Sequence, residues 1–463
     1  MIKRIAIATL TAVSIQASAD NKGAITPEML EDFKSSYIDN AANRARHNAL
    51  NAAGIDALAF NEKVRNKFDD HFSHKVETKG ITDQKSSGRC WLFTGLNVLR
   101  SQVMASHSLP QLTFSQNYNF FYDQLEKANL FLQGVIDTSD LPMENRQVEW
   151  LFQNPIADGG TFCGVADIVT KYGLVPSEVM AETEVANNTG AFRRHLSTRL
   201  REDGMRLRRA KKRGLDDDAL QEMKTKQLGE VYRMLVLALG EPPVEFTWTR
   251  RDSQGNALDT KTYTPQSFYR EFVGNDLKNN YIMLMNDPSR EYWKVYRIDY
   301  DRHSYDGQDW TYLNVPMADL KAAAIESIKD NTAMYFSCDV AKFLDRERGT
   351  LDLENFDYDS LFNSKFGMNK ADRISSWGSA SSHAMTLSGV DIDENGSPVK
   401  WLIENSWGKS GHNGYLIATD RWMDEYLFRL VVEKKYASPQ ILKAMNQIPI
   451  TLPSWDHLFL PDE

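Results

Sequence analysis

A short polar turn that leads directly into an amphipathic helix constrains this chain more than any other feature of its 463 residues. The turn is Gln-Lys-Ser-Ser-Gly-Arg at residues 84–89, and Cys90 follows it. Apolar residues then recur at helical spacing and predict a helix that starts at the cysteine; they are Leu92, Leu96, Leu99 and Val103. The positive end of a helix dipole lowers the pKa of a nearby thiol. This junction indicates that Cys90 is a nucleophile.

Two polar residues far along the chain are the candidate partners of this thiol. His383 opens an apolar, strand-like run, and Asn405 follows a second such run. Between them, residues 391–398 are a strong turn signal, so a hairpin is predicted to bring His383 and Asn405 together. An imidazole beside a thiol acts as its base, and an amide fixes the imidazole tautomer. Trp407 either shields that hydrogen bond from water or is only a core aromatic.

At these residues the chain resembles the papain-like cysteine peptidases, and more closely their bleomycin hydrolase and aminopeptidase C branch. The run Gln-Lys-Ser-Ser-Gly-Arg-Cys-Trp at 84–91 is typical of that branch, and it lacks the first cysteine of papain's own signature. Further ordered matches lie at residues 115–118, 125–129, 158–160, 171–173, 239–243, 286–288, 312–315 and 338–340. The resemblance implies an α+β, papain-like fold with a helical lobe, an antiparallel β lobe and a large insertion.

The resemblance also implies a role for each site residue. Cys90 would be the nucleophile, His383 the general base and acid, Asn405 its orienter, and Gln84 a side-chain donor to the oxyanion, with Trp407 in support. Asp158, Gly159, Gly160 and Glu463 would bind substrate. At 161–162, Thr-Phe stands in for a Gln-Trp pair common in the family. The expected activity is that of a cysteine-type aminopeptidase that hydrolyses N-terminal residues from peptides through a thioester.

The other cysteines fit a structural role. Cys163 and Cys338 follow no comparable turn and glutamine, so we expect both to be small hydrophobic core side chains. The chain shows neither a Cys/His metal spacing nor a phosphate-binding glycine loop, so no cofactor or metal is expected.

The spacing of the site residues predicts the organisation of the chain. Cys90 and His383 are separated by about 150 residues more than the roughly 130–150 of papain and its relatives, so an inserted subdomain is expected. The expected segments are a signal peptide (1–19), an N-terminal arm (20–75), the helical lobe with the nucleophile (76–174), the insertion (175–330), the β lobe with His383 and Asn405 (331–450), and a C-terminal tail near the active-site cleft (451–463).

The C-terminal tail leaves the type of peptidase open. In the aminopeptidase C branch this tail lies in the cleft, and its carboxylate meets the substrate's amino group. The family's ending of small residues is absent here, and residues 458–463 read Leu-Phe-Leu-Pro-Asp-Glu. An acidic end still attracts an ammonium group, so an aminopeptidase is favoured. The alternatives are a papain-like endopeptidase, a dipeptidyl-type peptidase, or an acyltransferase that passes the thioester to an amine.

A basic segment stands out in a chain whose net charge is −9. Ten lysines and arginines lie between Arg193 and Arg213, and Asp216 to Asp218 follow. The simple interpretation is a solvated helical hairpin in which Gly214 forms the turn. The alternatives are a surface for a subunit or an anionic ligand, or a nucleic-acid-binding protein of another class, which the negative net charge disfavours. The resemblance implies a homohexamer.

The N-terminus has the form of a secretory signal. A basic start at Lys3-Arg4 precedes a mostly apolar run from Ile5 to Ile15, and Ala-Ser-Ala at 17–19 is a cleavage-site pattern. We therefore expect export to a periplasm or to the outside of the cell, with a cytoplasmic location as the alternative. No other segment approaches the length of a membrane-spanning helix, so no transmembrane span is expected.

Overall fold

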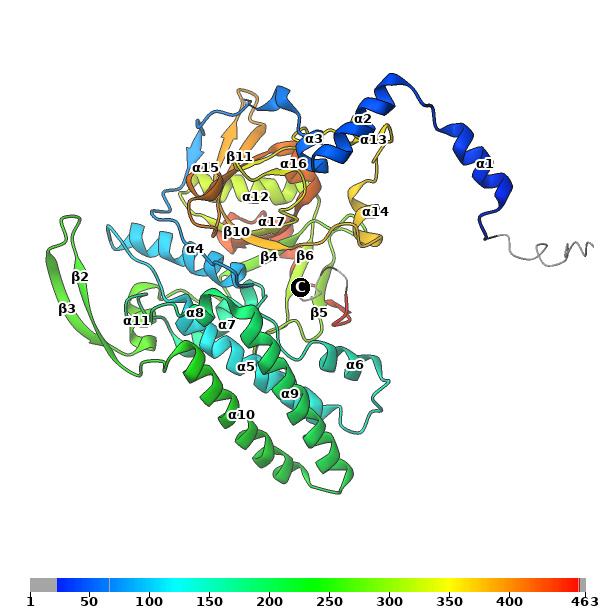
Figure 1. The fold of residues 1–463 in the computed structure, drawn as a ribbon. Coiled ribbons are helices and arrows are strands. Elements are labelled where there is room, and N and C mark those ends of the chain that lie inside the picture. The colour runs from blue at the N-terminus through cyan, green and yellow to red at the C-terminus, as the bar shows by residue number, and fades with distance from the viewer. Residues whose placement is uncertain (1–22, 66, 457, 459–463) are drawn as a thin grey trace, which may run out of the picture. The chain divides into compact units, whose positions relative to one another are not determined.

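The computed structural model describes residues 23–65, 67–456 and 458, which form two compact units (Figure 1). The smaller unit comprises the described residues up to 60 together with 357–364. Its helices are α1 (Pro27–Ser36), α2 (Ala41–Ala52), α3 (Ile55–Ala59) and α13 (Tyr358–Phe362). Thr26 caps α1 by accepting a hydrogen bond from the Met29 amide, and proline occupies the first helical position. The expected signal segment, 1–19, lies outside the described residues.

The nucleophile helix belongs to the larger unit and is buried along most of its length. Helix α4 (Cys90–Ser106) starts at the cysteine, as the sequence pattern predicted. Helices α5 (Gln116–Asp137) and α7 (Phe162–Tyr172) pack against it, and α6 (Arg146–Gln153) packs against α5. Ser115 caps α5 by accepting from the Tyr118 amide at 3.0 Å. These four helices make up the helical lobe.

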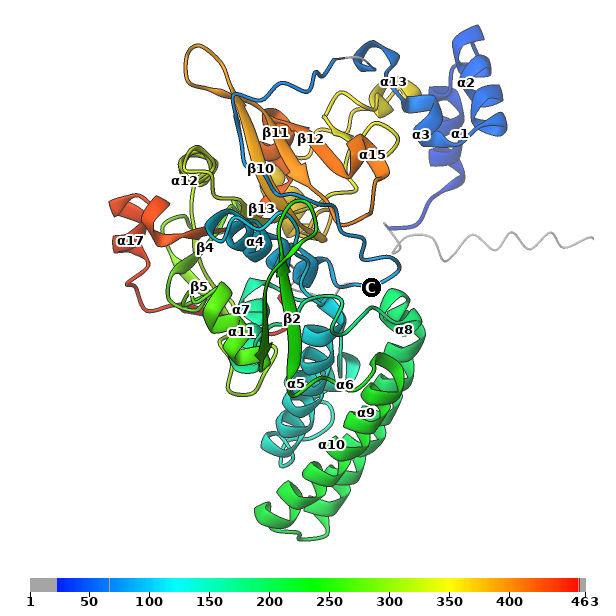
Figure 2. The ribbon, with the colours of Figure 1, turned by 90° about the vertical axis from the view of Figure 1, so that its left-hand side faces the viewer.

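A long helical hairpin and a two-stranded ribbon follow the helical lobe (Figures 1 and 2). Their elements are α8 (Glu184–Asn187), α9 (Thr189–Lys212), α10 (Asp217–Leu239), β2 (Phe246–Arg251), β3 (Ala257–Tyr263) and α11 (Pro265–Phe272). Gly214 turns the chain between α9 and α10 with a φ of +90°, a conformation that glycine adopts without strain. Asp216 caps α10 by accepting from the Ala219 amide at 2.9 Å. Residues 193–213 therefore lie on α9 and the turn after it.

A twelve-stranded mixed sheet forms the second lobe. Along its path the order is β14 (Ile450–Leu452), β5 (Val295–Ile298), β6 (Thr311–Asn314), β4 (Tyr281–Met285), β13 (Leu427–Glu433), β7 (Met334–Cys338), β10 (His383–Ile392), β11 (Pro398–Glu404), β12 (Tyr415–Thr419), β9 (Thr350–Leu351) and β8 (Leu344–Asp345), with β1 (His74–Lys75) paired to β10. Strands β4 to β6 come from residues we expected within the insertion. The sheet thus draws on a longer part of the chain than 331–450.

The pairing of β10 with β11 places the candidate site residues at one end of the sheet. The two strands are antiparallel, with Leu387 opposite Ile403. His383 is the first residue of β10, and Asn405 directly follows β11, so both lie at the end remote from the connecting turn. The predicted hairpin is present.

Two hydrophobic cores stabilise the larger unit. One joins α4 and its neighbouring helices to the sheet, and the other joins the sheet to α12 (Met317–Lys329). The remaining helical segments of the larger unit are η1 (Glu62–Val64), α14 (Lys370–Ser375), α15 (Ser410–Asn413), α16 (Asp420–Tyr426), η2 (Lys434–Tyr436) and α17 (Pro439–Ala444). The expected α+β fold class is confirmed. Within the described ranges, no helix is both long and apolar enough to cross a bilayer.

Close packing between α4 and α7 sets the position of the nucleophile helix. At Gly95 an added Cβ would lie 2.6 Å from a methyl carbon of Val165, well inside van der Waals contact. Only a glycine lets the two helices approach this closely.

Gly95→Ala is therefore expected to destabilise the fold by about 1–3 kcal/mol, because the new methyl group overpacks the α4–α7 contact. Gly229→Ala is the matched control. Gly229 lies inside α10 with only the tip of Arg233 within 4 Å. This second change is expected to stabilise by about 0.5–1 kcal/mol. Urea unfolding curves measure both, and equal effects of the two changes would contradict the packing argument.

Candidate active site

The turn before α4 is fixed by a buried arginine. Arg89 is fully buried, and its guanidinium binds the Glu182 carboxylate through two hydrogen bonds of 3.2 and 2.7 Å. Its Nε donates to the hydroxyl of Ser87 at 3.0 Å. On the far side of the cysteine, the Trp91 indole donates to the carbonyl of Asp158 at 2.8 Å. Cys90, 6% exposed, is thus held between two anchored neighbours.

His383 and Asn405 meet as the hairpin predicted. The imidazole Nε2 lies 2.9 Å from the Asn405 Oδ1, and both side chains are buried. That oxygen also accepts the Ser406 amide at 2.8 Å, which assigns it as the carbonyl oxygen of the side chain. Because an oxygen acceptor requires a donor, Nε2 carries the proton and Nδ1 keeps its lone pair. The ring of Trp407 stacks on the imidazole, with centroids 4.8 Å apart.

Gln84 connects the cysteine turn to the asparagine loop. Its Oε1 accepts the Ser406 hydroxyl at 2.6 Å, and its backbone amide donates to the Ser406 carbonyl at 2.8 Å. Its Nε2 donates to the Ser87 carbonyl at 2.7 Å. A side-chain amide nitrogen carries two N–H groups, so the second remains available as a donor.

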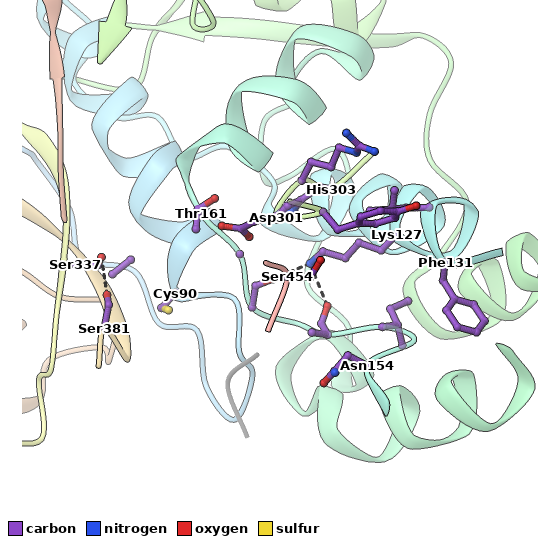
Figure 3. Close-up of a pocket in the computed structure, with 18 of the residues that line it drawn as sticks. Cys90, Lys127, Phe131, Asn154, Thr161, Asp301, His303, Ser337, Ser381 and Ser454 are labelled. Carbon is purple, nitrogen blue, oxygen red and sulfur yellow. Dashed lines mark hydrogen bonds between the residues drawn. The ribbon is translucent and has the colours of Figure 1, made fainter. Parts of the chain in front are cut away.

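One cavity of about 160 Å³ is lined by both Cys90 and His383, and Figure 3 shows part of its wall. Cys90 with residues 154–157 and 159–161 line it from the helical lobe, and Ser337 with 381–384 line it from the sheet. His383 and Cys90 therefore share one cavity while belonging to different lobes. The nucleophile, its base and a glycine-containing wall are brought together in a cleft between the lobes.

The glycine wall of the cleft rests on a buried polar cluster that sequence reasoning missed. Lys127 donates to the Gly159 carbonyl at 2.7 Å and pairs with Asp123 at 2.9 Å. His303 binds the other oxygen of Asp123 through Nδ1. The His303 ring lies so close that a Cβ at Gly160 would stand 2.1 Å from its Cε1. His303 comes from the β5–β6 segment, and its sequence context carries no signal of this role.

The four residues predicted to bind substrate do not all line the cleft. Gly159 and Gly160 line the cavity, but Asp158 does not. The Asp158 carboxylate accepts the Thr189 hydroxyl at 2.5 Å, away from the cleft. Glu463 lies outside the described residues. Nearby parts of the C-terminal segment reach the cleft, because Ser454 lines it and Arg429 donates to the Leu458 carbonyl at 2.7 Å.

Burial controls the charge of the imidazole. Desolvation lowers the pKa of His383 to about 4, while the hydrogen bond that its Nε2 donates to Asn405 acts in the opposite direction. On its own the imidazole is therefore neutral at pH 7. A proton that moves from the Cys90 thiol to Nδ1 creates both charges at once, so the thiolate and the imidazolium stabilise each other and titrate as a pair.

The other two cysteines have a different environment. Cys163 and Cys338 are buried, and desolvation raises the pKa of both thiols well above the usual range. They are thus neutral thiols, and all three cysteines are free of disulfides. In the part of the chain that the structure describes, no group of three or more His, Cys, Asp or Glu side chains is placed to hold a metal ion.

Four arginines of the basic segment on α9 form bonds within the protein. Arg199 pairs with Asp203 and Glu230, and Arg206 pairs with Glu202. Other arginines donate to backbone carbonyls; Arg201 binds those of Phe152 and Gln153, and Arg208 binds those of Thr138 and Leu141. These bonds match the interpretation of a structural hairpin and give no support to a nucleic-acid surface.

Comparisons with known proteins agree with this geometry. The family model described as Peptidase C1-like family matches residues 24–459. Aminopeptidase E of Lactobacillus helveticus is 38% identical over 94% of this chain and 99% of its own, and bleomycin hydrolase of Mus musculus is 38% identical over 83% and 87%. The crystal structure of PepW from Lactobacillus rhamnosis superposes with a TM-score of 0.90 at 34% identity, covering 94% of this chain and 99% of that one. The chain therefore belongs to the Peptidase C1-like family, and it is a cysteine peptidase with the papain-like α+β fold that its sequence led us to expect.

Proposed function

We propose that the protein is an aminopeptidase that releases N-terminal residues from peptides through a thioester at Cys90. The observation that carries the proposal is the orientation of His383. Asn405 fixes the proton on Nε2, which leaves the lone pair on Nδ1, and His383 lines the same cavity as Cys90. Relatives over most of the chain are named aminopeptidases, which supports the exopeptidase assignment.

The reaction follows from the positions of these groups. Nδ1 of His383 takes the thiol proton, and the Cys90 sulfur bonds to the carbonyl carbon of the substrate. The imidazolium then gives its proton to the leaving amine as the C–N bond breaks, which leaves a thioester. His383 next takes a proton from water, whose oxygen attacks the thioester, and the proton returns to the sulfur. The products are a free amino acid and a shortened peptide.

The negative charge that develops on the substrate's carbonyl oxygen needs hydrogen-bond donors. We consider the backbone amide of Cys90 and the side-chain amide of Gln84. The amide of Cys90 is the first of α4, so no helical carbonyl can accept it. Gln84 offers the second N–H of its side chain, since the first binds Ser87. Preorganised donors of this kind are each worth roughly 100- to 1000-fold in rate. We assign Gln84 to the oxyanion and Gly159–Gly160 to the substrate backbone.

The C-terminal segment supports cleavage near the substrate's N-terminus. Ser454 lines the cleft, and the buried Leu458 is held to it through Arg429. Chain anchored at this place limits how far a peptide extends on that side. An open cleft would instead suit an endopeptidase.

The intact enzyme is expected to cleave peptides with a free amine at least tenfold faster than the same peptides N-acetylated. Removing residues 458–463 is expected to reduce this preference, because the segment held by Arg429 is lost. Fluorogenic substrates with matched free and acetylated ends measure both values. Equal cleavage of the two substrates by the intact enzyme would contradict the aminopeptidase assignment.

Asn405→Ala is expected to slow alkylation of Cys90 by iodoacetamide near pH 7 by roughly 10- to 100-fold. In the native enzyme the hydrogen bond to Asn405 raises the pKa of His383. Removing that bond destabilises the imidazolium, and therefore also the thiolate paired with it. The rising limb of the rate against pH then moves to more alkaline values. Asn395→Ala, in the turn between β10 and β11, is the control. A profile unchanged by Asn405→Ala would refute the orienting role.

We also propose that the protein is exported and assembles as a homohexamer. Residues 3–19 have the pattern of a cleaved signal, and the family resemblance suggests the hexamer. Periplasmic or extracellular material is expected to begin at Asp20 on N-terminal sequencing and to have six times the chain mass by light scattering. Cytoplasmic enzyme that retains residues 1–19 would refute export. A monomeric mass would refute the hexamer.

A further inference from the structure

A carboxylate in the cleft has no place in the mechanism described above. Asp301 lines the same cavity as Cys90 and His383, and Figure 3 shows its side chain beside Thr161 on the cavity wall. It lies between β5 and β6, where its carbonyl accepts the Trp310 amide at 2.8 Å. Tyr300, the residue before it, has a φ of +61°, an unfavourable conformation for a tyrosine. Such strain is typical of positions whose geometry serves a function.

One carboxylate oxygen of Asp301 lacks a hydrogen-bond partner among the described residues. That oxygen, Oδ2, is shielded from solvent, and no donor in the described part of the chain reaches it. A buried acceptor left unpaired is costly, and native structures contain few of them. The carboxylate of Asp301 therefore keeps an acceptor that none of the described donors uses.

The described bonds of the basic side chains around the cleft go to groups other than Asp301, and Nε of Arg302 is buried with no partner among the described residues. Lys127 binds Asp123 and the carbonyls of Ala157 and Gly159. Arg302 pairs with Asp309 at 3.3 Å, and Arg429 donates to the Leu458 carbonyl. Lys127 and Arg429 lie close enough to lower the pKa of Asp301, yet among the described residues no basic group donates to its carboxylate.

We propose that Asp301 binds the free α-ammonium group of the peptide substrate. This inference rests on the proposed aminopeptidase function and names the group that recognises the substrate's end. A cavity of about 160 Å³ matches the size of a single side chain, since a cavity of about 150 Å³ holds one benzene molecule. An ammonium group seated at the wall of so small a cavity places the first peptide bond, rather than a later one, within reach of Cys90.

Asp301→Asn keeps the shape of the side chain and removes its charge. For a free-amine aminoacyl amide we expect KM to rise roughly 10- to 100-fold with a smaller change in kcat, as for the loss of a hydrogen bond between charged groups. For the N-acetylated amide, kcat/KM should stay within about twofold or increase. Asp299→Asn is the matched control, because it makes the same change on the same loop at a residue that does not line the cavity.

The pH dependence gives a second readout that a purely structural role would not produce. Burial raises the pKa of Asp301 to about 6, with Arg429 and Lys127 acting against the shift and Asp309 in its favour. Protonation of the carboxyl as pH falls through about 6 removes its attraction for the ammonium, so 1/KM for the free-amine substrate should fall there. Asp301→Asn should abolish this limb while Asp299→Asn retains it. The rate of Cys90 alkylation by neutral iodoacetamide reports whether each variant keeps an intact nucleophile.

The possible outcomes separate this inference from the function beneath it. If the wild-type enzyme cleaves free-amine and N-acetylated substrates equally well, the aminopeptidase proposal is wrong, and this inference with it. Wild-type enzyme that prefers the free amine, with the preference intact in Asp301→Asn, overturns the inference alone. A loss confined to substrates with lysine side chains also overturns it, because Asp301 would then bind a side-chain ammonium. A variant that fails to alkylate is replaced by Asp301→Glu, whose retained charge should preserve most of the free-amine preference.

Discussion

A buried ion pair between the two lobes is the interaction on which the active site depends. Arg100 of the nucleophile helix and Glu404 at the end of β11 are both buried, and Nη2 lies 2.8 Å from Oε1. The same nitrogen donates to the Gly80 carbonyl at 2.9 Å. Removing one partner of such a pair leaves a buried charge and costs about 3–5 kcal/mol. Because Glu404 directly precedes Asn405, the pair fixes the helix that carries the thiol against the strand that positions the imidazole.

Short backbone contacts extend this connection to the catalytic groups. The amide of Gln84 binds the Ser406 carbonyl, and the amide of Gly408 binds the Thr82 carbonyl. The turn before Cys90 thus pairs with the loop after Asn405 like two strands, and Gln84 also receives the Ser406 hydroxyl. Movement of one lobe relative to the other would disturb the donor, the base and the nucleophile together, so rigidity here favours a preorganised site.

Cys90, His383 and Asn405 were predictable because each lies within a recognisable local sequence pattern. The helix at Cys90 begins with a change of periodicity, and a turn signal announces the hairpin that unites His383 with Asn405. The support beneath the glycine wall was not predictable, because His303 and Asp123 are far apart in sequence and meet only through the fold. The same limit explains Asp158. Its motif suggested a cleft residue, but contact with Thr189 turns its carboxylate away.

Burial acts in the same way on two ionisable groups of the cleft, His383 and Asp301, because it disfavours the charged form of each. Burial makes the imidazolium of His383 unfavourable until a thiolate forms beside it, and burial makes the carboxylate of Asp301 unfavourable until a cation reaches it. His383 gains its counter-charge as the Cys90 thiolate forms, whereas Asp301 already interacts with the charges of Arg429 and Lys127 and, on our inference, gains a directly bound cation from the substrate. A ligand without an ammonium group leaves the buried carboxylate of Asp301 unpaired. The cost of that burial therefore favours ligands that carry an ammonium group.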